Sequence, residues 1–150
     1  MKKTHFYAVI LGIFLVMIGV RPAFAATWVI GPDQDPPVMP PGTIGTWNED
    51  ARTFTLAGDT PLGDNIEIID NGITLDGDGH TVKGTDVLNS KGISLEHSRY
   101  ITVKNLTIEG FTTGIRLYNY HSVNEDMRKG HNTIIDNTIS SCNTGISVGA

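Results

Sequence analysis

Short runs of alternating apolar and polar residues dominate the chain from position 26 onward. One four-residue unit of this kind occurs at positions 72–75, 92–95, 114–117 and 145–148. Alternation over such short runs is typical of β-strands, and Asn, Asp and Gly between the runs are typical of tight turns. The pattern therefore predicts an all-β chain with no helix after position 25.

A longer repeat aligns residues 101–110 with residues 132–141, at an offset of 31 positions, and residues 73–84 precede them with the same texture. A single coil of three short strands cannot bury its apolar side chains, whereas coils stacked ~4.8 Å apart share one core. The turns recur in step with the strands. This favours a parallel β-helix over an antiparallel sandwich, in which the turns have no reason to repeat.

Stacking predicts which residues lie above one another. The expected inward ladders are Ile73/Ile101, Leu75/Val103/Ile134, Val82/Ile108/Ile139 and Leu95/Leu117/Val148. The expected outward ladders are Thr74/Thr102/Thr133, Lys83/Glu109/Ser140 and Ser94/Arg116/Ser147. Asn105 and Asp136 fall at one sharp turn, where Asn and Asp tolerate left-handed backbone angles.

About three to four coils are expected over residues 51–150, with residues 26–50 as an N-terminal cap or linker. The runs 53–56 and 66–69 resemble an incomplete starting coil, and Trp28 and Trp47 are expected to cover its open end. We expect the solenoid to continue beyond Ala150, because the last coil has no cap and exposes an apolar cross-section. Self-association through that open coil is the alternative.

The segment 1–25 has the features of a secretory signal peptide. Lys2 and Lys3 precede a nearly unbroken apolar run over positions 6–20, and small residues follow as Ala23-Phe24-Ala25. The run is shorter than the ~20 residues that a membrane span requires. We expect cleavage after Ala25 and a secreted or periplasmic protein with no membrane span in the mature chain.

Charge narrows the range of partners. The leader holds three of the 11 basic residues and none of the 16 acidic ones, so residues 26–150 carry a formal charge of −8. A surface this acidic repels phosphate backbones and anionic lipid. Nucleic acid is therefore excluded as an expected partner, and a polyanionic glycan is disfavoured.

The repeats also resemble a known group of proteins. Residues 72–84 (GITLDGDGHTVKG), 101–111 (ITVKNLTIEGF) and 132–139 (NTIIDNTI) are similar to the right-handed parallel β-helix repeats of the pectin-lyase-like superfamily. The residue pattern of these repeats is most similar to that of NosD-type periplasmic proteins and of related carbohydrate-binding and sugar-hydrolase repeat domains. The resemblance implies the fold more than the activity, because that superfamily includes lyases, hydrolases, epimerases and non-enzymes.

Two groups of residues are candidate metal ligands. Asp76, Asp78 and His80 lie within five positions and offer oxygen ligands for Ca²⁺, although Ca²⁺ needs six to eight oxygens and paired Asp-Gly turns explain the same residues. The NosD-type resemblance implies copper, for which imidazole is a suitable ligand. His97 and His121 follow the third strands of successive coils and would then stack; exposed loop histidines are the alternative.

Aromatic residues suggest a sugar-binding face. Tyr100, Phe111, Tyr118 and Tyr120 are expected around one edge of two coils, where tyrosine rings pack on apolar sugar faces while their hydroxyls form hydrogen bonds. Core-capping aromatics are the alternative. Two residues expected to point outward complete the candidate sugar contacts, Arg116 and Glu109.

The sequence leaves the activity open. The Asn-Thr-Asp, Asp-Asp and Gly-His-Gly signatures of polygalacturonase-like enzymes are missing, as is the acidic cluster of pectate lyases, so no complete catalytic site is visible. The leading hypothesis is a secreted or periplasmic module that binds a polysaccharide or cell-envelope glycan, or serves as a surface scaffold. The alternatives are the N-terminal part of a polysaccharide lyase or hydrolase, and a NosD-like periplasmic copper-handling protein.

Overall fold

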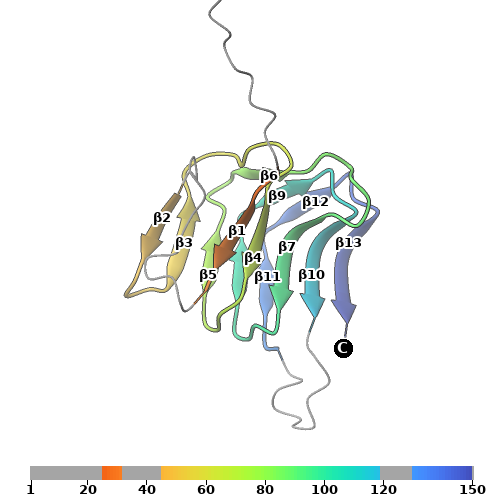
Figure 1. The fold of residues 1–150 in the computed structure, drawn as a ribbon. Coiled ribbons are helices and arrows are strands. Elements are labelled where there is room, and N and C mark those ends of the chain that lie inside the picture. The colour runs from red at the N-terminus through yellow and green to blue at the C-terminus, as the bar shows by residue number, and fades with distance from the viewer. Residues whose placement is uncertain (1–24, 32–44, 119–129, 150) are drawn as a thin grey trace, which may run out of the picture.

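The alternating pattern folds into short strands that belong to three sheets. A computed structural model describes residues 25–31, 45–118 and 130–149. Sheet A has the order β1 (Thr27–Ile30), β4 (Asn65–Ile68), β7 (Lys91–Glu96), β10 (Thr113–Tyr118), β13 (Thr144–Gly149). Sheet B has the order β11 (Thr133–Ile135), β8 (Thr102–Lys104), β5 (Thr74–Asp76), β3 (Thr53–Leu56), β2 (Gly45–Asn48), and sheet C the order β12 (Thr138–Ser140), β9 (Thr107–Glu109), β6 (Thr81–Lys83) (Figure 1).

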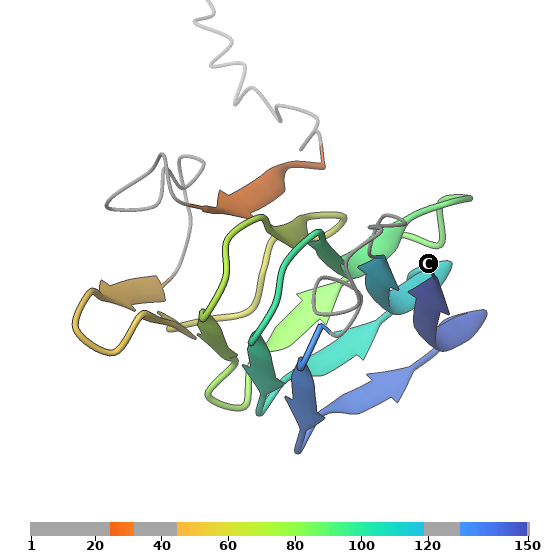
Figure 2. The ribbon, with the colours of Figure 1, turned by 90° about the horizontal axis from the view of Figure 1, so that it is seen from below.

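Each complete coil passes through sheet B, then sheet C, then sheet A. Three coils of the described chain follow this path, β5–β7, β8–β10 and β11–β13, and Figure 2 shows them side by side, with the colour running from green to blue from one coil to the next. β3 and β4 form a starting coil that has no described strand in sheet C. No helix occurs in the described ranges, and the sheets are parallel except at β2. The predicted all-β architecture of stacked parallel strands is confirmed.

The strand register confirms the predicted ladders that lie within strands; Ile73 and Ile101 precede β5 and β8 and are not part of this register. Leu75 lies opposite Val103, and Val103 opposite Ile134. The other inward ladders run Val82–Ile108–Ile139 and Leu95–Leu117–Val148, and the outward ladders run Thr74–Thr102–Thr133, Lys83–Glu109–Ser140 and Ser94–Arg116–Ser147. Because side chains alternate between the two faces of a strand, this register points every second residue of these strands inward, and in the coils that have a neighbour on both sides these residues form the core.

Asparagine side chains join consecutive coils at the turns. Asn132 accepts a hydrogen bond from the backbone N–H of Ile101, at 3.0 Å, and Asn137 accepts one from Leu106, at 3.0 Å. Asn105 and Asp136 adopt φ angles of 55° and 54°, as predicted for the sharp turn between sheets B and C. These bonds satisfy backbone groups that the short strands leave without a partner.

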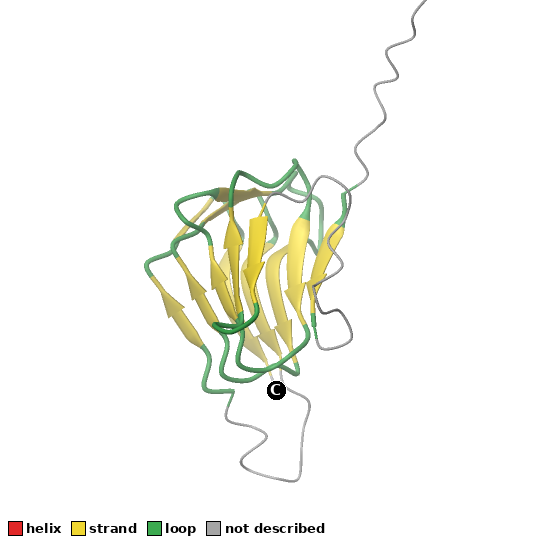
Figure 3. Cartoon of the chain, turned by 90° about the vertical axis from the view of Figure 1, so that its left-hand side faces the viewer, coloured by secondary structure: helices red, strands yellow, loops and turns green. Residues whose placement is uncertain are grey.

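The first coil is covered by two further strands. β1 pairs in parallel with β4, and Trp28 on β1 is buried in the core. β2 pairs antiparallel with β3 on the side of the solenoid that faces the viewer in Figure 3. Trp47 on β2 is half-buried and packs against the same core. The expected cover of the starting coil by the two tryptophans is therefore confirmed.

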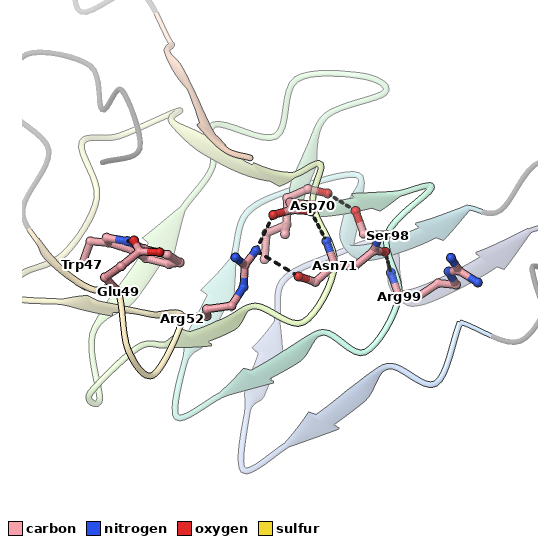
Figure 4. A network of polar contacts seen from close by, with 8 residues as sticks. Trp47, Glu49, Arg52, Asp70, Asn71, Ser98 and Arg99 are labelled. Carbon is pink, nitrogen blue, oxygen red and sulfur yellow. Dashed lines mark hydrogen bonds and ion pairs between the residues drawn. The ribbon is translucent and has the colours of Figure 1, made fainter. Parts of the chain in front are cut away.

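A polar network fixes the corner that follows β4 (Figure 4). The Arg52 guanidinium forms an ion pair with Asp70 and also donates to the backbone oxygen of Asn71, at 3.2 Å. The Asn71 side chain accepts a hydrogen bond from the Arg99 backbone at 2.7 Å, and the buried Ser98 hydroxyl donates to the Ile68 oxygen at 2.7 Å. The network joins the starting coil to the next coil where sheet A leads into sheet B.

Candidate functional site

The outer face of sheet A carries a group of charged and aromatic side chains. In the register of β7 and β10, Ser94 lies beside Arg116 and Glu96 lies beside Tyr118. These residues alternate with Ile93, Leu95, Ile115 and Leu117, which point into the core. We define the outer-face cluster as Lys91, Ser94, Glu96, Arg116 and Tyr118.

Glu96 is held as a carboxylate within this cluster. Lys91 Nζ lies 2.6 Å from Glu96 Oε1, and the Ser94 hydroxyl donates to the same oxygen at 3.2 Å. The hydrogen bond from Lys91, together with the charges of Lys91 and Arg116, lowers the pKa of Glu96 against the opposing effect of burial. The carboxylate is therefore a fixed hydrogen-bond acceptor at neutral pH.

Arg116 lies over the Tyr118 ring, with Cζ 5.3 Å from the ring centroid. The ring also lies against the next strand, because a Cβ atom added to Gly149 would come within 2.8 Å of Tyr118 Cδ2. Within the described ranges Arg116 forms no ion pair with a carboxylate, unlike Lys91. A guanidinium stacked on a ring still presents N–H donors along its edge, where a ligand can accept hydrogen bonds from them.

A second aromatic contact lies at the corner after sheet A. The Tyr100 and His131 rings are stacked with centroids 5.3 Å apart, and His97 meets Tyr118 edge-on at 6.5 Å. His97, Tyr100 and His131 adopt φ angles of 63°, 59° and 49°, and Tyr100 is 60% exposed. Positive φ is uncommon for such large side chains and is often retained at functional sites.

The sequence-predicted sugar contacts are divided among several places. Arg116 and Tyr118 belong to the outer-face cluster, and Tyr100 lies at the neighbouring corner. Glu109 lies on sheet C instead, where it pairs with Lys83 at 2.9 Å and raises the pKa of that lysine. Tyr120 falls outside the described residues. The inclusion of Phe111 was wrong, because its ring is 2% exposed and belongs to the core.

The candidate metal ligands Asp76, Asp78 and His80 do not converge. Burial alone would raise the pKa of Asp76, but hydrogen bonds from Lys104 and Asn105 outweigh it and leave the pKa lowered. Asp78 lines a hollow of about 410 Å³ at the next turns, and His80 Nδ1 lies 3.6 Å from Asp59 instead. The carboxylate of Asp76 thus already has its partners within the protein.

The histidines do not form a described metal site either. His97 contacts Tyr118 at one corner of the coil and His80 contacts Asp59 at another, while His121 falls outside the described residues. Over residues 25–31, 45–118 and 130–149, no three His, Cys, Asp or Glu side chains are grouped closely enough to hold one metal ion. This part of the chain therefore does not fit a resident copper or calcium ion.

Two members of the outer-face cluster, Lys91 and Glu96, were missed by the sequence reasoning. Both flank the repeated unit at residues 92–95, and the same alignment that pairs Ser94 with Arg116 places Glu96 beside Tyr118. The sequence therefore held a signal for Glu96, which directly follows the last apolar residue of the repeated unit.

The repeats match a known family. A family model described as periplasmic copper-binding protein (NosD) matches residues 49–150, which include all the complete coils. The chain belongs to the NosD family. The match covers the outer-face cluster and the Tyr100–His131 corner, whereas β1 and β2 precede it. No curated protein and no solved structure matches this NosD-family chain.

The family description is that of periplasmic proteins. Within the residues that the structure describes, no helix has the length and apolar character needed to cross a membrane. The expected leader, residues 1–25, lies outside the described ranges except for Ala25.

Proposed function

We propose that this NosD-family chain is an exported, periplasmic β-helix module that binds a cell-envelope glycan along the outer face of sheet A. The observation that carries the proposal is the contact of Arg116 with Tyr118 beside the fixed carboxylate of Glu96. An aromatic ring packs on the apolar face of a sugar, and flanking charged groups bond its hydroxyls. The cluster supplies one ring, a carboxylate acceptor and two cationic donors on one rigid sheet.

Binding rather than catalysis is favoured by the protonation of these groups. An acid catalyst for glycoside cleavage needs a carboxyl group whose pKa is raised. The pKa values of Glu96 and Asp76 are instead both lowered by cationic and hydrogen-bonding neighbours. Glu96 is therefore suited to accept hydrogen bonds from hydroxyl groups and unsuited to donate a proton.

The test is glycan binding by matched variants. Arg116→Ala combined with Tyr118→Ala removes the ring and one cation, and we expect at least about tenfold weaker retention, as for a central binding contact. Affinity electrophoresis against the glycan selected on an envelope-polysaccharide array measures this loss.

Lys83→Ala is the matched control, because it removes a cation from sheet C and leaves sheet A intact. Tyr118→Phe keeps the ring and separates stacking from the hydroxyl group. Equal retention by the double variant and the wild type, with circular dichroism unchanged, would contradict the proposal.

Copper handling is a second candidate, favoured by the family description. The described residues contain no group of three ligands, so the proposal concerns His97 and His121, which the sequence places after successive strands of sheet A. Copper titration of the purified chain against a chromophoric chelator tests it. Stoichiometric uptake that is lost in the His97→Ala, His121→Ala double variant and kept in His80→Ala would support copper handling; no uptake by the wild type would exclude it.

A further inference from the structure

Asp64 is a buried carboxylate at the start of the solenoid. It is 6% exposed and precedes β4 directly. Its Oδ1 atom accepts a hydrogen bond from the backbone nitrogen of Ala26 at 2.8 Å, and its Oδ2 atom accepts one from Trp28 Nε1 at 2.9 Å. The backbone N–H of Asn65 in turn donates to the Ala26 oxygen at 3.0 Å. Residues 26–28 are thereby held against the segment that leads into β4.

Both donors to Asp64 are uncharged while Ala26 remains linked to Ala25. Across the described residues, no Lys, Arg or His side chain forms an ion pair with Asp64. A carboxylate withdrawn from water is costly unless a positive charge lies beside it. The Ala26 nitrogen lies within hydrogen-bond distance and acquires such a charge if the bond to Ala25 is cleaved.

We propose that the Ala25–Ala26 bond is the processing site of the exported chain and that the α-ammonium group released there forms an ion pair with Asp64. A leader peptidase adds water to the Ala25 carbonyl carbon, and the C–N bond to Ala26 breaks. Ala25 leaves with a carboxylate, and the Ala26 nitrogen keeps its pair of electrons and takes up protons to become an ammonium group. The small residues at positions 23 and 25 fit the requirement of such a peptidase.

The surroundings leave space for the new group. Ala25 is exposed and lines a hollow of about 310 Å³ together with Thr27, Gly63 and Asn65. Loss of Ala25 therefore opens the Ala26 nitrogen to water on the side away from Asp64. One N–H bond of the ammonium group keeps the contact with Asp64, and the remaining two reach solvent.

The consequence is that cleavage of the leader strengthens the attachment of β1 to the start of the solenoid. Before cleavage, a neutral amide donates to Asp64; after cleavage, the same nitrogen atom carries a full positive charge, as α-amino groups do at neutral pH. Charge-assisted hydrogen bonds are roughly twice as strong as neutral ones. β1 and its buried Trp28 are therefore attached more firmly in the processed protein than in the precursor.

The experiment compares three amino-terminal forms of the mature protein in urea unfolding. They are residues 26–150 with a free amine, the same chain acetylated on Ala26, and residues 25–150. Acetylation keeps one N–H donor and removes only the charge. We expect the unfolding equilibrium constant to be about tenfold larger in the two forms without an ammonium group on Ala26, as for loss of a hydrogen bond between charged groups.

Asp64→Asn provides the matched control, because it removes the negative charge and keeps the shape. In this background the three forms should unfold alike. Equal stability of the free and acetylated forms of the wild-type chain would overturn the proposal, even where Asp64→Asn fails to fold. Amino-terminal sequencing of the exported protein is the second readout: Ala26 as first residue is expected, and any other first residue would equally overturn it.

Discussion

The first and the last described coils place similar residues in different surroundings. One inward position of sheet A is isoleucine in four successive coils, Ile66, Ile93, Ile115 and Ile146. The first three are 0% exposed, whereas Ile146 is 46% exposed. At the start, β1 and β2 cover the first coil, whereas Val148 in β13 is 78% exposed.

This contrast shows that an inward side chain of a solenoid is buried by the neighbouring coils on both sides of its own coil. Ile93 is enclosed because β4 lies on one side of β7 and β10 on the other. Ile146 has the same residue type, register and inward direction, and it has β10 on one side. A side chain is therefore stabilised by the coil above and the coil below, and the repeat pattern alone does not fix its energy.

A pair of matched cavity-forming substitutions should show the largest difference in the free energy of unfolding. Ile93→Ala removes a fully enclosed side chain and should lower the free energy of unfolding by about 3 kcal/mol. Ile146→Ala removes a half-exposed side chain and should cost about 1 kcal/mol or less. Urea unfolding followed by circular dichroism measures both.

Equal costs for the two isoleucine substitutions would contradict the comparison, because they would mean that Ile146 is covered in solution. The size of the cost at position 146 thus also reports on self-association, which predicts a cost that rises with protein concentration.

A second pair of substitutions tests how closely the backbones of neighbouring coils approach one another. A Cβ atom on Gly114 would lie 2.6 Å from Ile139 Cγ2 and 2.7 Å from the Gly145 oxygen, whereas one on Gly145 meets its nearest atom at 4.0 Å. Gly114→Ala should therefore destabilise by about 2 kcal/mol through overpacking, and Gly145→Ala should be close to neutral. Thermal unfolding of the two variants distinguishes them, and a neutral Gly114→Ala would show that neighbouring coils are free to separate.

Removal of the negative charge of Asp76 should have the smallest effect on the free energy of unfolding. Asp76 faces Lys104 in the next coil at 2.8 Å, but the following residue of that ladder is Ile135. The pKa of Asp76 is lowered in the fold, so its contribution to stability is present above the ordinary value of 3.8 and is lost as pH falls through the folded value. Asp76→Asn should lower stability by under about 1 kcal/mol at pH 7.

The difference between Asp76→Asn and the wild type should shrink as the pH falls through the lowered pKa of folded Asp76, because the aspartate is then protonated in both folded and unfolded chains. Melting temperatures measured from about pH 2.5 to pH 7 provide the check. Asp136→Asn is the control, because Asp136 occupies an exposed turn of the last coil at a φ angle that Asn tolerates. A constant difference at all pH values would show that the Lys104 contact is not electrostatic.

Much of the fold follows from the sequence because every coil repeats the same local chemistry. The alternation predicted the inward and outward residues, and the recurring turns predicted the register of Leu75, Val103 and Ile134. β1 was not predicted as part of a sheet, because its contact with β4 joins two segments that lie far apart in the chain and share no repeat.

The candidate site was harder to predict from the sequence. Arg116 and Tyr118 were identified because they lie on or beside the repeated unit. Lys91 and Glu96 were missed because their contact requires a side chain at one end of β7 to reach the other end. Phe111 was misplaced because an aromatic residue at a turn can point to either side, and only the packing beneath the turn decides which.

The in-register ladders have a consequence for how such a chain changes length. Removal of one whole turn, residues 102–132, would bring β5 against β11 with Leu75 facing Ile134 and Val82 facing Ile139, much as each now faces its own neighbour. The apolar side chains would again face apolar ones, but Asp76 would face Ile135 in place of Lys104, and Lys83 would face Ser140 in place of Glu109. We therefore expect a solenoid of this kind to tolerate the loss or gain of whole coils, because its length changes while its cross-section stays the same.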